Sequence, residues 1–217
     1  MTQPGFSTSI TQRIKECKLV PVVRAASADE AMRAIDAIKA GGIDILEITM
    51  TVPGAVRLME DVAGRYGDDV LVGAGTVLDP ETARACILAG ARFIVSPALN
   101  LETIALCRRY SIPVMPGALT PTEVITAWQA GADMVKVFPC SAMGGASYLK
   151  ALKAPLPQVD LIPTGGVSLE TAADFLAAGA SALGIGADLV NLNALRDGRA
   201  AEITAKARHY VEIATSA

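Results

Sequence analysis

The 217-residue chain is 52% hydrophobic but only 4% aromatic, and its formal net charge at pH 7 is −3. This length predicts a single domain over residues 1–217, and the interspersed charges leave no basic patch that would favour nucleic acid as a partner. No apolar run reaches the roughly 18 residues of a membrane span, and the N-terminus lacks the pattern of a secretory signal, so we expect a cytoplasmic protein without membrane association.

Short apolar runs alternate with longer alanine-rich stretches along the chain. A helix is predicted first, around residues 7–18 ("STSITQRIKECK"). Eight candidate strands follow, at residues 19–24, 45–49, 70–76, 93–97, 112–117, 134–139, 161–166 and 182–186. Each is a nearly continuous apolar run, as expected of parallel strands covered by helices.

Helix signals stand between these strands. Starts with Ser, Asp or Thr as N-cap and Glu in the first turn are predicted in residues 27–34, 79–85, 120–127 and 168–175. Left-handed glycines that end helices are predicted at Gly41, Gly90, Gly131 and Gly179. Eight βα units of this size predict an α/β fold, a (β/α)8 TIM barrel with an extra N-terminal helix. A Rossmann sheet is disfavoured because no GxGxxG follows the first strand.

The sixth strand contains a lysine. Lys136 lies between Val135 and Val137, and if strand alternation points it into the barrel, Met134 and Phe138 share its face. Burial disfavours the charged form of an amine, and a neutral amine is a nucleophile that condenses with carbonyls. We therefore interpret Lys136 as a Schiff-base residue near the mouth of the barrel. The alternative is a lysine that extends its ammonium group outward to solvent.

Polar side chains also stand within or at the ends of neighbouring strands. Glu47, inside the second strand, is expected to transfer protons, and the alternative is a structural ion pair with Lys136 or Arg24. Arg24 and Thr76, which close the first and third strands, suit a carboxylate or phosphate. For Arg24 the alternative is an exposed strand-end residue. Thr51 is ambiguous between a loop hydroxyl and a ligand contact.

The loops after strands seven and eight, residues 163–168 and 184–190, are rich in glycine. In TIM barrels these two loops often bind phosphate through backbone N–H groups. The predicted phosphate-binding residues are Thr164, Gly165, Gly166, Gly186 and Ala187.

The residues that usually hold metals are sparse. The four cysteines form no CxxC pair, so the sequence predicts neither a zinc site nor a disulfide framework. The single histidine, His209, is interpreted as a solvated or helix-packing residue. With one histidine and no clustered carboxylates, we expect no metal and no cofactor.

Several sequence blocks together resemble the family of 2-keto-3-deoxy-6-phosphogluconate (KDPG) aldolases. That family also contains 4-hydroxy-2-oxoglutarate (KHG) aldolases and 6-phosphogalactonate-specific relatives. The blocks are "ILEITMTVPGA", "VGAGTVLDPE", "FIVSPALN", "VMPGALTPTE", "VKVFPCSAMGG" and "LIPTGGVSLE", and the resemblance runs from about residue 12 to about residue 212. It implies a metal-free class I aldolase on a (β/α)8 barrel, typically a homotrimer, acting on a 2-keto acid.

The resemblance also implies roles for matching positions. The Schiff-base lysine matches Lys136 and the proton-transferring glutamate matches Glu47. Thr76 is implied to bind the pyruvyl carboxylate. Some members carry the carboxylate-binding arginine where this chain has Thr51, and others carry it at Arg24, so we assign that role to Arg24. The expected pocket residues are Thr51, Pro97 and Phe138.

One departure from the family pattern affects the expected substrate. Ala187 stands where many members place a serine that contacts the phosphate, and a lost hydrogen bond to a charged group weakens binding by about 1.5–3 kcal/mol. We expect cleavage of KDPG to pyruvate and glyceraldehyde 3-phosphate. Cleavage of KHG to pyruvate and glyoxylate, or of the 6-phosphogalactonate epimer, stays open.

Two hypotheses of different classes also stay open. One is a phosphate-binding barrel of another enzyme class, which would need a cluster of Asp and Lys or of metal-binding acids at the strand ends, and the sequence shows no obvious one. The second is a non-enzymatic trimeric scaffold that keeps only the fold. The presence of Lys136 and Glu47 disfavours the scaffold.

Overall fold

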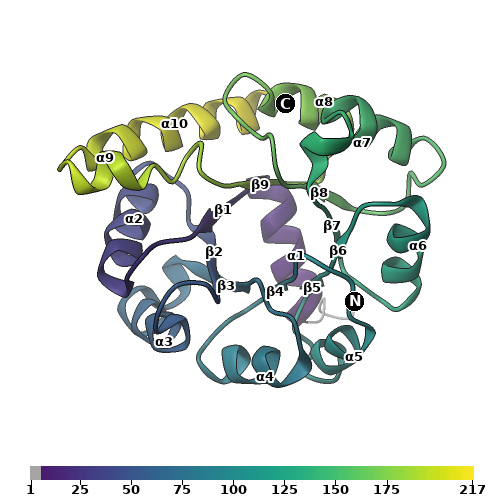
Figure 1. Cartoon of the computed structure of the whole chain (residues 1–217), viewed down its shortest axis with the longest axis horizontal. Helices are drawn as coiled ribbons and strands as arrows, with labels where there is room; N and C mark the ends of the chain where they lie inside the picture. The colour runs from purple at the N-terminus through teal and green to yellow at the C-terminus, as the bar shows by residue number, and fades with distance from the viewer. Residues whose placement is uncertain (1–5) are drawn as a thin grey trace, which may run out of the picture.

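Parallel strands lie inside a ring of helices in the computed structural model, which describes residues 6–217 (Figure 1). The strands are β1 (Leu19–Val23), β2 (Ile45–Thr49), β3 (Leu71–Gly75), β4 (Ile94–Val95), β5 (Val114–Met115), β6 (Gly117–Ala118), β7 (Val135–Val137), β8 (Leu161–Pro163) and β9 (Leu183–Ile185). Segments β5 and β6 are the two halves of the predicted fifth strand. They are separated by Pro116, which has no N–H to donate to a sheet ladder.

The strands close into a barrel. One sheet has the order β5-β4-β3-β2-β1-β9 and the second has the order β6-β7-β8, so the split fifth strand joins them. Between β8 and β9, a bridge pairs Thr164 with Gly184, and the Ser181 N–H donates to the Leu161 carbonyl at 2.9 Å. The predicted (β/α)8 barrel is therefore confirmed.

The helices are α1 (Phe6–Cys17), α2 (Ala28–Ala40), α3 (Ala55–Tyr66), α4 (Pro80–Leu88), α5 (Leu101–Arg109), α6 (Pro121–Gln129), α7 (Ala146–Lys153), α8 (Ala172–Ala177), α9 (Leu192–Arg196) and α10 (Ala200–Ser216). Helix α1 is the predicted extra N-terminal helix. None of the helices in residues 6–217 is both long and apolar enough to cross a membrane.

Local capping chemistry fixes most helix boundaries. Ser27, Asp79 and Thr120 each accept a backbone N–H from the third residue that follows, as their sequence patterns predict. The helix predicted to start in 168–175 does begin there, at Ala172, but its N-cap Thr171 makes no side-chain capping hydrogen bond. Upstream of it, the Thr171 hydroxyl accepts the Ser168 N–H at 2.9 Å and donates to the Gly166 carbonyl at 2.8 Å, which holds these residues in a turn.

The glycines that end helices follow the prediction with one exception. Gly90, Gly131 and Gly179 have φ values of 98°, 92° and 96°, in the left-handed region. Gly41 does not, since its φ is −85°, and Gly42 takes the left-handed conformation with φ 96°. A Cβ on Gly41 would lie 2.4 Å from the Ala207 Cβ, so Gly41 is needed for the close approach of α10 to α2.

The apolar core has two layers, which follow from the alternation of side chains along each strand. The outer layer, between strands and helices, contains Val135 and Val137. Met134 belongs to the inner layer, as predicted. Ile10 and Ile14 of α1 pack against that inner layer, so α1 fills the end of the barrel where the strands begin (Figure 1). The members of the inner layer are Ile10, Ile14, Val20, Ile45, Leu71, Phe93, Val95, Met115, Met134, Ile162 and Ala182.

Candidate active site

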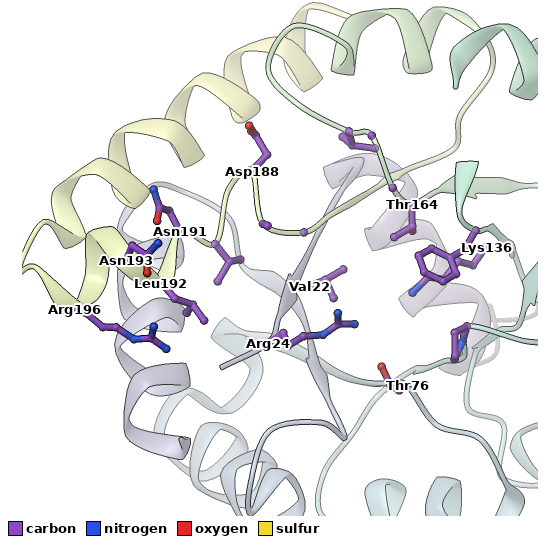
Figure 2. Close-up of a pocket in the computed structure, with 18 residues that line it drawn as sticks. Val22, Arg24, Thr76, Lys136, Thr164, Asp188, Asn191, Leu192, Asn193 and Arg196 are labelled. Atoms are coloured by element: carbon purple, nitrogen blue, oxygen red, sulfur yellow. The ribbon is translucent and has the colours of Figure 1, made fainter. Parts of the chain in front are cut away.

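A cavity of about 650 Å³ opens at the carboxyl ends of the strands (Figure 2). Its volume lies in the usual range for small-molecule sites, and the carboxyl face is where TIM barrels carry their chemistry. Its lining comes from the ends of β1, β3, β7, β8 and β9 and from the segments that follow β4, β8 and β9.

Two buried charged side chains meet at this end of the barrel. Lys136, which lines the cavity, and Glu47 are 6% and 2% exposed, and 3.8 Å separates Lys136 Nζ from Glu47 Oε1. Both point inward, so Lys136 does not extend outward to solvent. The Lys136 ammonium also lies 5.5 Å from the centroid of the Phe138 ring. The pair places a potential nucleophile beside a potential proton carrier.

The Glu47 carboxylate is incompletely satisfied. Oε1 is a buried oxygen without a hydrogen-bond partner among the residues that the structure describes. Leaving a buried polar group unpaired costs about 1–3 kcal/mol, and more when it is charged. A purely structural ion pair would be closer and fully hydrogen-bonded. The geometry therefore favours a carboxylate held ready for a substrate proton or a water over a structural role.

The end of β3, the strand beside β2, explains how the Glu47 carboxylate fits. A Cβ on Gly75 would lie 1.8 Å from Glu47 Oε1, so only glycine leaves room there. The next residue, Thr76, has φ 57°, a left-handed conformation that is rare for a β-branched residue. Strain of this kind costs on the order of 1–3 kcal/mol and concentrates at functional sites. Here the strained residue, Thr76, lines the cavity.

The predicted carboxylate-binding residues lie at the mouth. Arg24 is exposed and extends its guanidinium toward Thr76 and Lys136 (Figure 2). Arg24 makes no ion pair within residues 6–217, so its donors are available to an anion. Pro97 and Phe138 line the same cavity. A planar guanidinium beside a hydroxyl suits a carboxylate.

All five predicted phosphate-binding residues also line this cavity. Gly165 and Gly166 have φ values of 92° and 78°, and a Cβ on Gly166 would lie 2.6 Å from the Ser141 Cβ. On the opposite loop, the Gly186 carbonyl accepts the N–H groups of Leu189 and Val190 at 3.2 and 3.1 Å, which closes a turn. N–H groups at the start of such a turn have no acceptor within it and suit an anion.

Thr51, which is predicted as a pocket residue, is not among the residues that line this cavity. Thr51 is exposed and lines a separate surface hollow with residues 50–57 and Glu60. Its hydroxyl lies 2.7 Å from that of Thr49, which donates to the Val23 carbonyl at 3.2 Å. Thr49 is buried, and this pair of hydroxyls joins the end of β2 to the neighbouring strand β1.

Sequence reasoning missed the segment around α9, which forms one wall of the cavity. Asn191 caps α9 by accepting the Ala194 N–H at 3.1 Å, a pattern that could have predicted a short helix at the mouth. Arg196 donates to Glu30 at 2.6 Å, and this hydrogen bond, together with that from the Ala26 N–H, lowers the pKa of Glu30. The missed lining residues are Val22, Val167, Asp188, Val190, Asn191, Leu192, Asn193 and Arg196.

The remaining reactive side chains lie elsewhere or are masked by burial. Burial raises the pKa of the Cys140 thiol to about 11, so this thiol stays protonated and is a poor nucleophile. His209 is exposed on α10 and does not line the cavity. No cluster of three or more His, Cys, Asp or Glu side chains that could hold a metal ion occurs in the part of the chain that the structure describes.

Comparisons with known proteins agree in pointing to one family. A family model described as KDPG and KHG aldolase matches residues 10–206. The chain is 38% identical over 189 residues to the 2-dehydro-3-deoxy-6-phosphogalactonate aldolase of Escherichia coli K12, covering 87% of this chain and 89% of that protein. It is 34% identical to the 2-dehydro-3-deoxy-phosphogluconate aldolase of Dickeya dadantii, covering 98% and 99% of the two chains.

A solved structure adds a chemical detail about a relative. The KDPG aldolase of Legionella pneumophila superposes with a TM-score of 0.84 at 29% identity, covering 94% of this chain and 97% of that one. Its pyruvate was captured at low pH as a covalent carbinolamine intermediate.

Proposed function

The chain belongs to the KDPG and KHG aldolase family and is therefore a carbon–carbon lyase, and we propose that it cleaves KDPG through a Schiff base on Lys136. The observation that carries this proposal is the buried pair of Lys136 and Glu47, 3.8 Å apart, beside a cavity lined by an unpaired arginine and two glycine-rich loops. The carbinolamine captured in the Legionella relative supports covalent chemistry of the same kind.

In the proposed reaction, the neutral amine of Lys136 attacks the C2 carbonyl of the 2-keto acid. The resulting carbinolamine takes up one proton, loses water and becomes an iminium, which is an electron sink; that proton is released again when the final iminium is hydrolysed to the neutral amine. Arg24 and Thr76 hold the C1 carboxylate at the mouth, so that the carbonyl carbon lies over the lysine. Fixing the carboxylate in this way converts the attack into an intramolecular step.

Glu47 then acts as the proton carrier. It accepts the proton of the C4 hydroxyl while the C3–C4 bond breaks and its electrons move into the iminium, which leaves an enamine and a free aldehyde. Glu47 returns the proton to C3 of the enamine, and water hydrolyses the new iminium to pyruvate and Lys136. Each proton that the carboxylate accepts is returned to carbon, so the residue is regenerated within one turnover.

The distal phosphate of KDPG would bind between the two glycine-rich loops. Backbone N–H groups of Gly165, Gly166 and the turn after Gly186 would donate to it, since Ala187 has no hydroxyl to contribute. At the same rim, Arg196 forms an ion pair with Glu30 and so offsets its negative charge. The relatives named as aldolases of a 6-phosphogalactonate and of a phosphogluconate support a phosphorylated substrate.

An assay of three substrates tests this assignment. KDPG, its galactonate epimer and KHG would each be offered to the enzyme, with pyruvate measured by lactate dehydrogenase and the aldehyde identified by mass spectrometry. We expect kcat/KM to be highest for KDPG, with equal amounts of pyruvate and glyceraldehyde 3-phosphate. If kcat/KM is highest for KHG, the assignment of a phosphorylated substrate is overturned. If none of the three substrates yields pyruvate, the assignment of aldolase activity is overturned.

We further propose a single domain over residues 1–217 that assembles as a homotrimer in the cytoplasm. Large apolar side chains are exposed on three successive helices, with Leu88 at the end of α4, Leu101 at the start of α5 and Trp128 on α6. Exposed apolar surface of this kind favours an interface with further copies of the chain. Sedimentation equilibrium is expected to give three times the mass of one chain, and a monomer mass would contradict the trimer.

A further inference from the structure

The turn that follows β9 carries an acidic side chain at the edge of the cavity. Asp188 lines the cavity one residue after Ala187, and its carboxylate points away from Lys136, toward α10 (Figure 2). A free carboxylate beside the two glycine-rich loops would repel a phosphate dianion. How this charge is held therefore bears on what the loops can bind.

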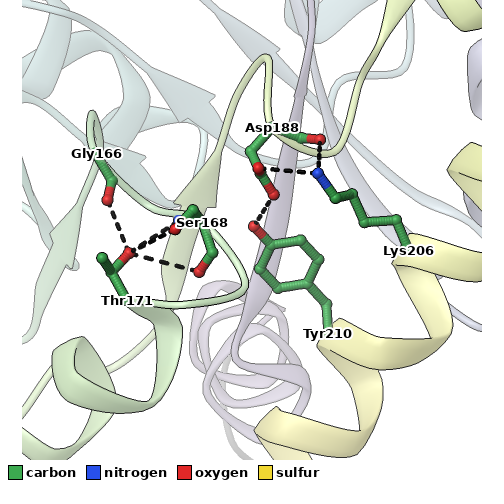
Figure 3. A network of polar contacts seen from close by, with 6 residues as sticks. All are labelled: Gly166, Ser168, Thr171, Asp188, Lys206 and Tyr210. Carbon is green, nitrogen blue, oxygen red and sulfur yellow. Dashed lines mark hydrogen bonds and ion pairs between the residues drawn. The ribbon is translucent and has the colours of Figure 1, made fainter.

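Two side chains of α10 hold Asp188 (Figure 3). Lys206 Nζ donates to Asp188 Oδ1 at 2.9 Å and to the Asp188 carbonyl oxygen at 2.8 Å, and the Tyr210 hydroxyl donates to Oδ2 at 2.5 Å. Lys206 and Tyr210 are four residues apart and so lie on one face of the helix. Both carboxylate oxygens and the main-chain carbonyl of Asp188 are thus bound to α10.

The tyrosine in this arrangement stays a hydrogen-bond donor. Tyr210 is fully buried, and this burial, followed by its hydrogen bond to Asp188, raises the pKa of the phenol. Since the phenol does not ionise in the working pH range, it never adds a second negative charge at this end of the cavity. Lys206 contributes the compensating positive charge.

Fixing Asp188 also fixes the backbone that faces the cavity. The turn is closed by the Gly186 carbonyl, and the N–H groups of Ala187 and Asp188 lie at its start, without an acceptor inside it. Their direction is set by where Asp188 is anchored. The opposite loop is held in a similar way, because the Thr171 hydroxyl bonds both to the Gly166 carbonyl and to the Ser168 N–H (Figure 3).

We propose that Lys206 and Tyr210 are positioning residues that select for a substrate with a distal phosphate. By neutralising and anchoring Asp188, they aim the backbone N–H groups of the 186–190 turn at the phosphate and remove the repulsion that Asp188 would exert. This arrangement compensates for the missing hydroxyl at Ala187. The proposal rests on the proposed function, because it assigns the recognition of the phosphate in that same cavity.

The test separates phosphate recognition from the chemistry at Lys136. Tyr210→Phe and Lys206→Met are assayed for kcat and KM with KDPG, for inhibition by inorganic phosphate, and for the pyruvate concentration that gives half-maximal borohydride trapping. The KM for KDPG and the inhibition constant for phosphate are expected to rise about tenfold in each variant, which is the size of effect expected for one charge-assisted hydrogen bond. The kcat and the trapping by pyruvate stay at wild-type values, and Lys206→Arg restores the KM.

Tyr66→Phe is the matched control. The Tyr66 hydroxyl of α3 donates to Asp36 of α2, and neither residue lines the cavity. The variant therefore loses the same kind of hydrogen bond, and we expect the KM for KDPG and the inhibition constant for phosphate to stay unchanged. An unchanged KM for KDPG in Tyr210→Phe and Lys206→Met would overturn the inference. So would an equal rise in the KM for KDPG and in the pyruvate concentration that gives half-maximal trapping. A wild-type enzyme that neither traps pyruvate nor cleaves KDPG would instead overturn the proposed function. Lys206 is partly exposed, so its variant stays informative if Tyr210→Phe unfolds.

Discussion

Replacing Lys136 with methionine is expected to lower kcat/KM for KDPG by a factor on the order of 10⁶, the size of effect that removal of a covalent nucleophile produces. Methionine has a similar length and no amine, so no iminium forms and the C3–C4 electrons have no acceptor. Borohydride reduction in the presence of pyruvate, followed by peptide mass mapping, is expected to show an adduct on Lys136 in the wild type and none in the variant.

The controls for this experiment address folding and lysine specificity. Lys150→Met removes an exposed lysine of α7 and is expected to keep both the activity and the adduct. The thermal unfolding of Lys136→Met is measured alongside, because the variant leaves Glu47 without its neighbouring cation. An adduct on another lysine, or a folded Lys136→Met enzyme with more than about one hundredth of the wild-type activity, would contradict the assigned role.

Replacing Glu47 with glutamine is expected to lower kcat by about 10²–10⁴-fold, the usual contribution of a general acid–base group. The amide keeps the shape of the side chain but cannot accept the proton of the C4 hydroxyl. Lys136 remains, so pyruvate is still trapped by borohydride. In D₂O the wild type is expected to exchange the methyl protons of pyruvate for deuterium, and Glu47→Gln is expected to lose this exchange.

This deuterium readout distinguishes catalysis from structure. Glu102→Gln, an exposed substitution on α5, is the matched control and is expected to exchange at the wild-type rate. If Glu47→Gln exchanges at a rate close to that of the wild type while its unfolding temperature falls, Glu47 is a structural partner of Lys136 and another group moves the proton. Loss of exchange with retained trapping assigns the proton transfer to Glu47.

Features that depend on neighbours in the sequence could be predicted without a structure. The barrel follows from the repetition of apolar runs and helix starts, and caps such as Ser27 and Asp79 act within four residues. Lys136 and Glu47 stand out for the same reason, because a charged side chain inside a short apolar run must face either the barrel interior or the helix layer. Alternation leaves two faces to choose from, and the buried contact of 3.8 Å between Lys136 Nζ and Glu47 Oε1 shows that both side chains face the interior.

Features that depend on distant contacts could not be predicted. Asp188 is bound by residues 18 and 22 positions further along the chain, and no local pattern marks that pairing. The position of Thr51 just after a strand predicts a pocket residue, whereas Thr51 lines a separate surface hollow and its hydroxyl lies 2.7 Å from that of Thr49. Residues 168–171 resemble a helix N-terminus, but the hydroxyl of Thr171 satisfies a turn there, so α8 begins later than the pattern predicts.

Helix α1 has a consequence for the order in which products leave. Ile10 and Ile14 close the end of the barrel opposite the mouth, so in the proposed mechanism substrate and products all pass through the carboxyl face. In that mechanism the ketone carbon of the substrate is covalently bonded to Lys136, whereas the aldehyde half is held only by non-covalent contacts of its phosphate. After cleavage the aldehyde leaves first, and pyruvate follows only when its bond to the enzyme is hydrolysed. In the synthetic direction, pyruvate must enter before the aldehyde, which makes the aldehyde the acceptor of a nucleophile already in place.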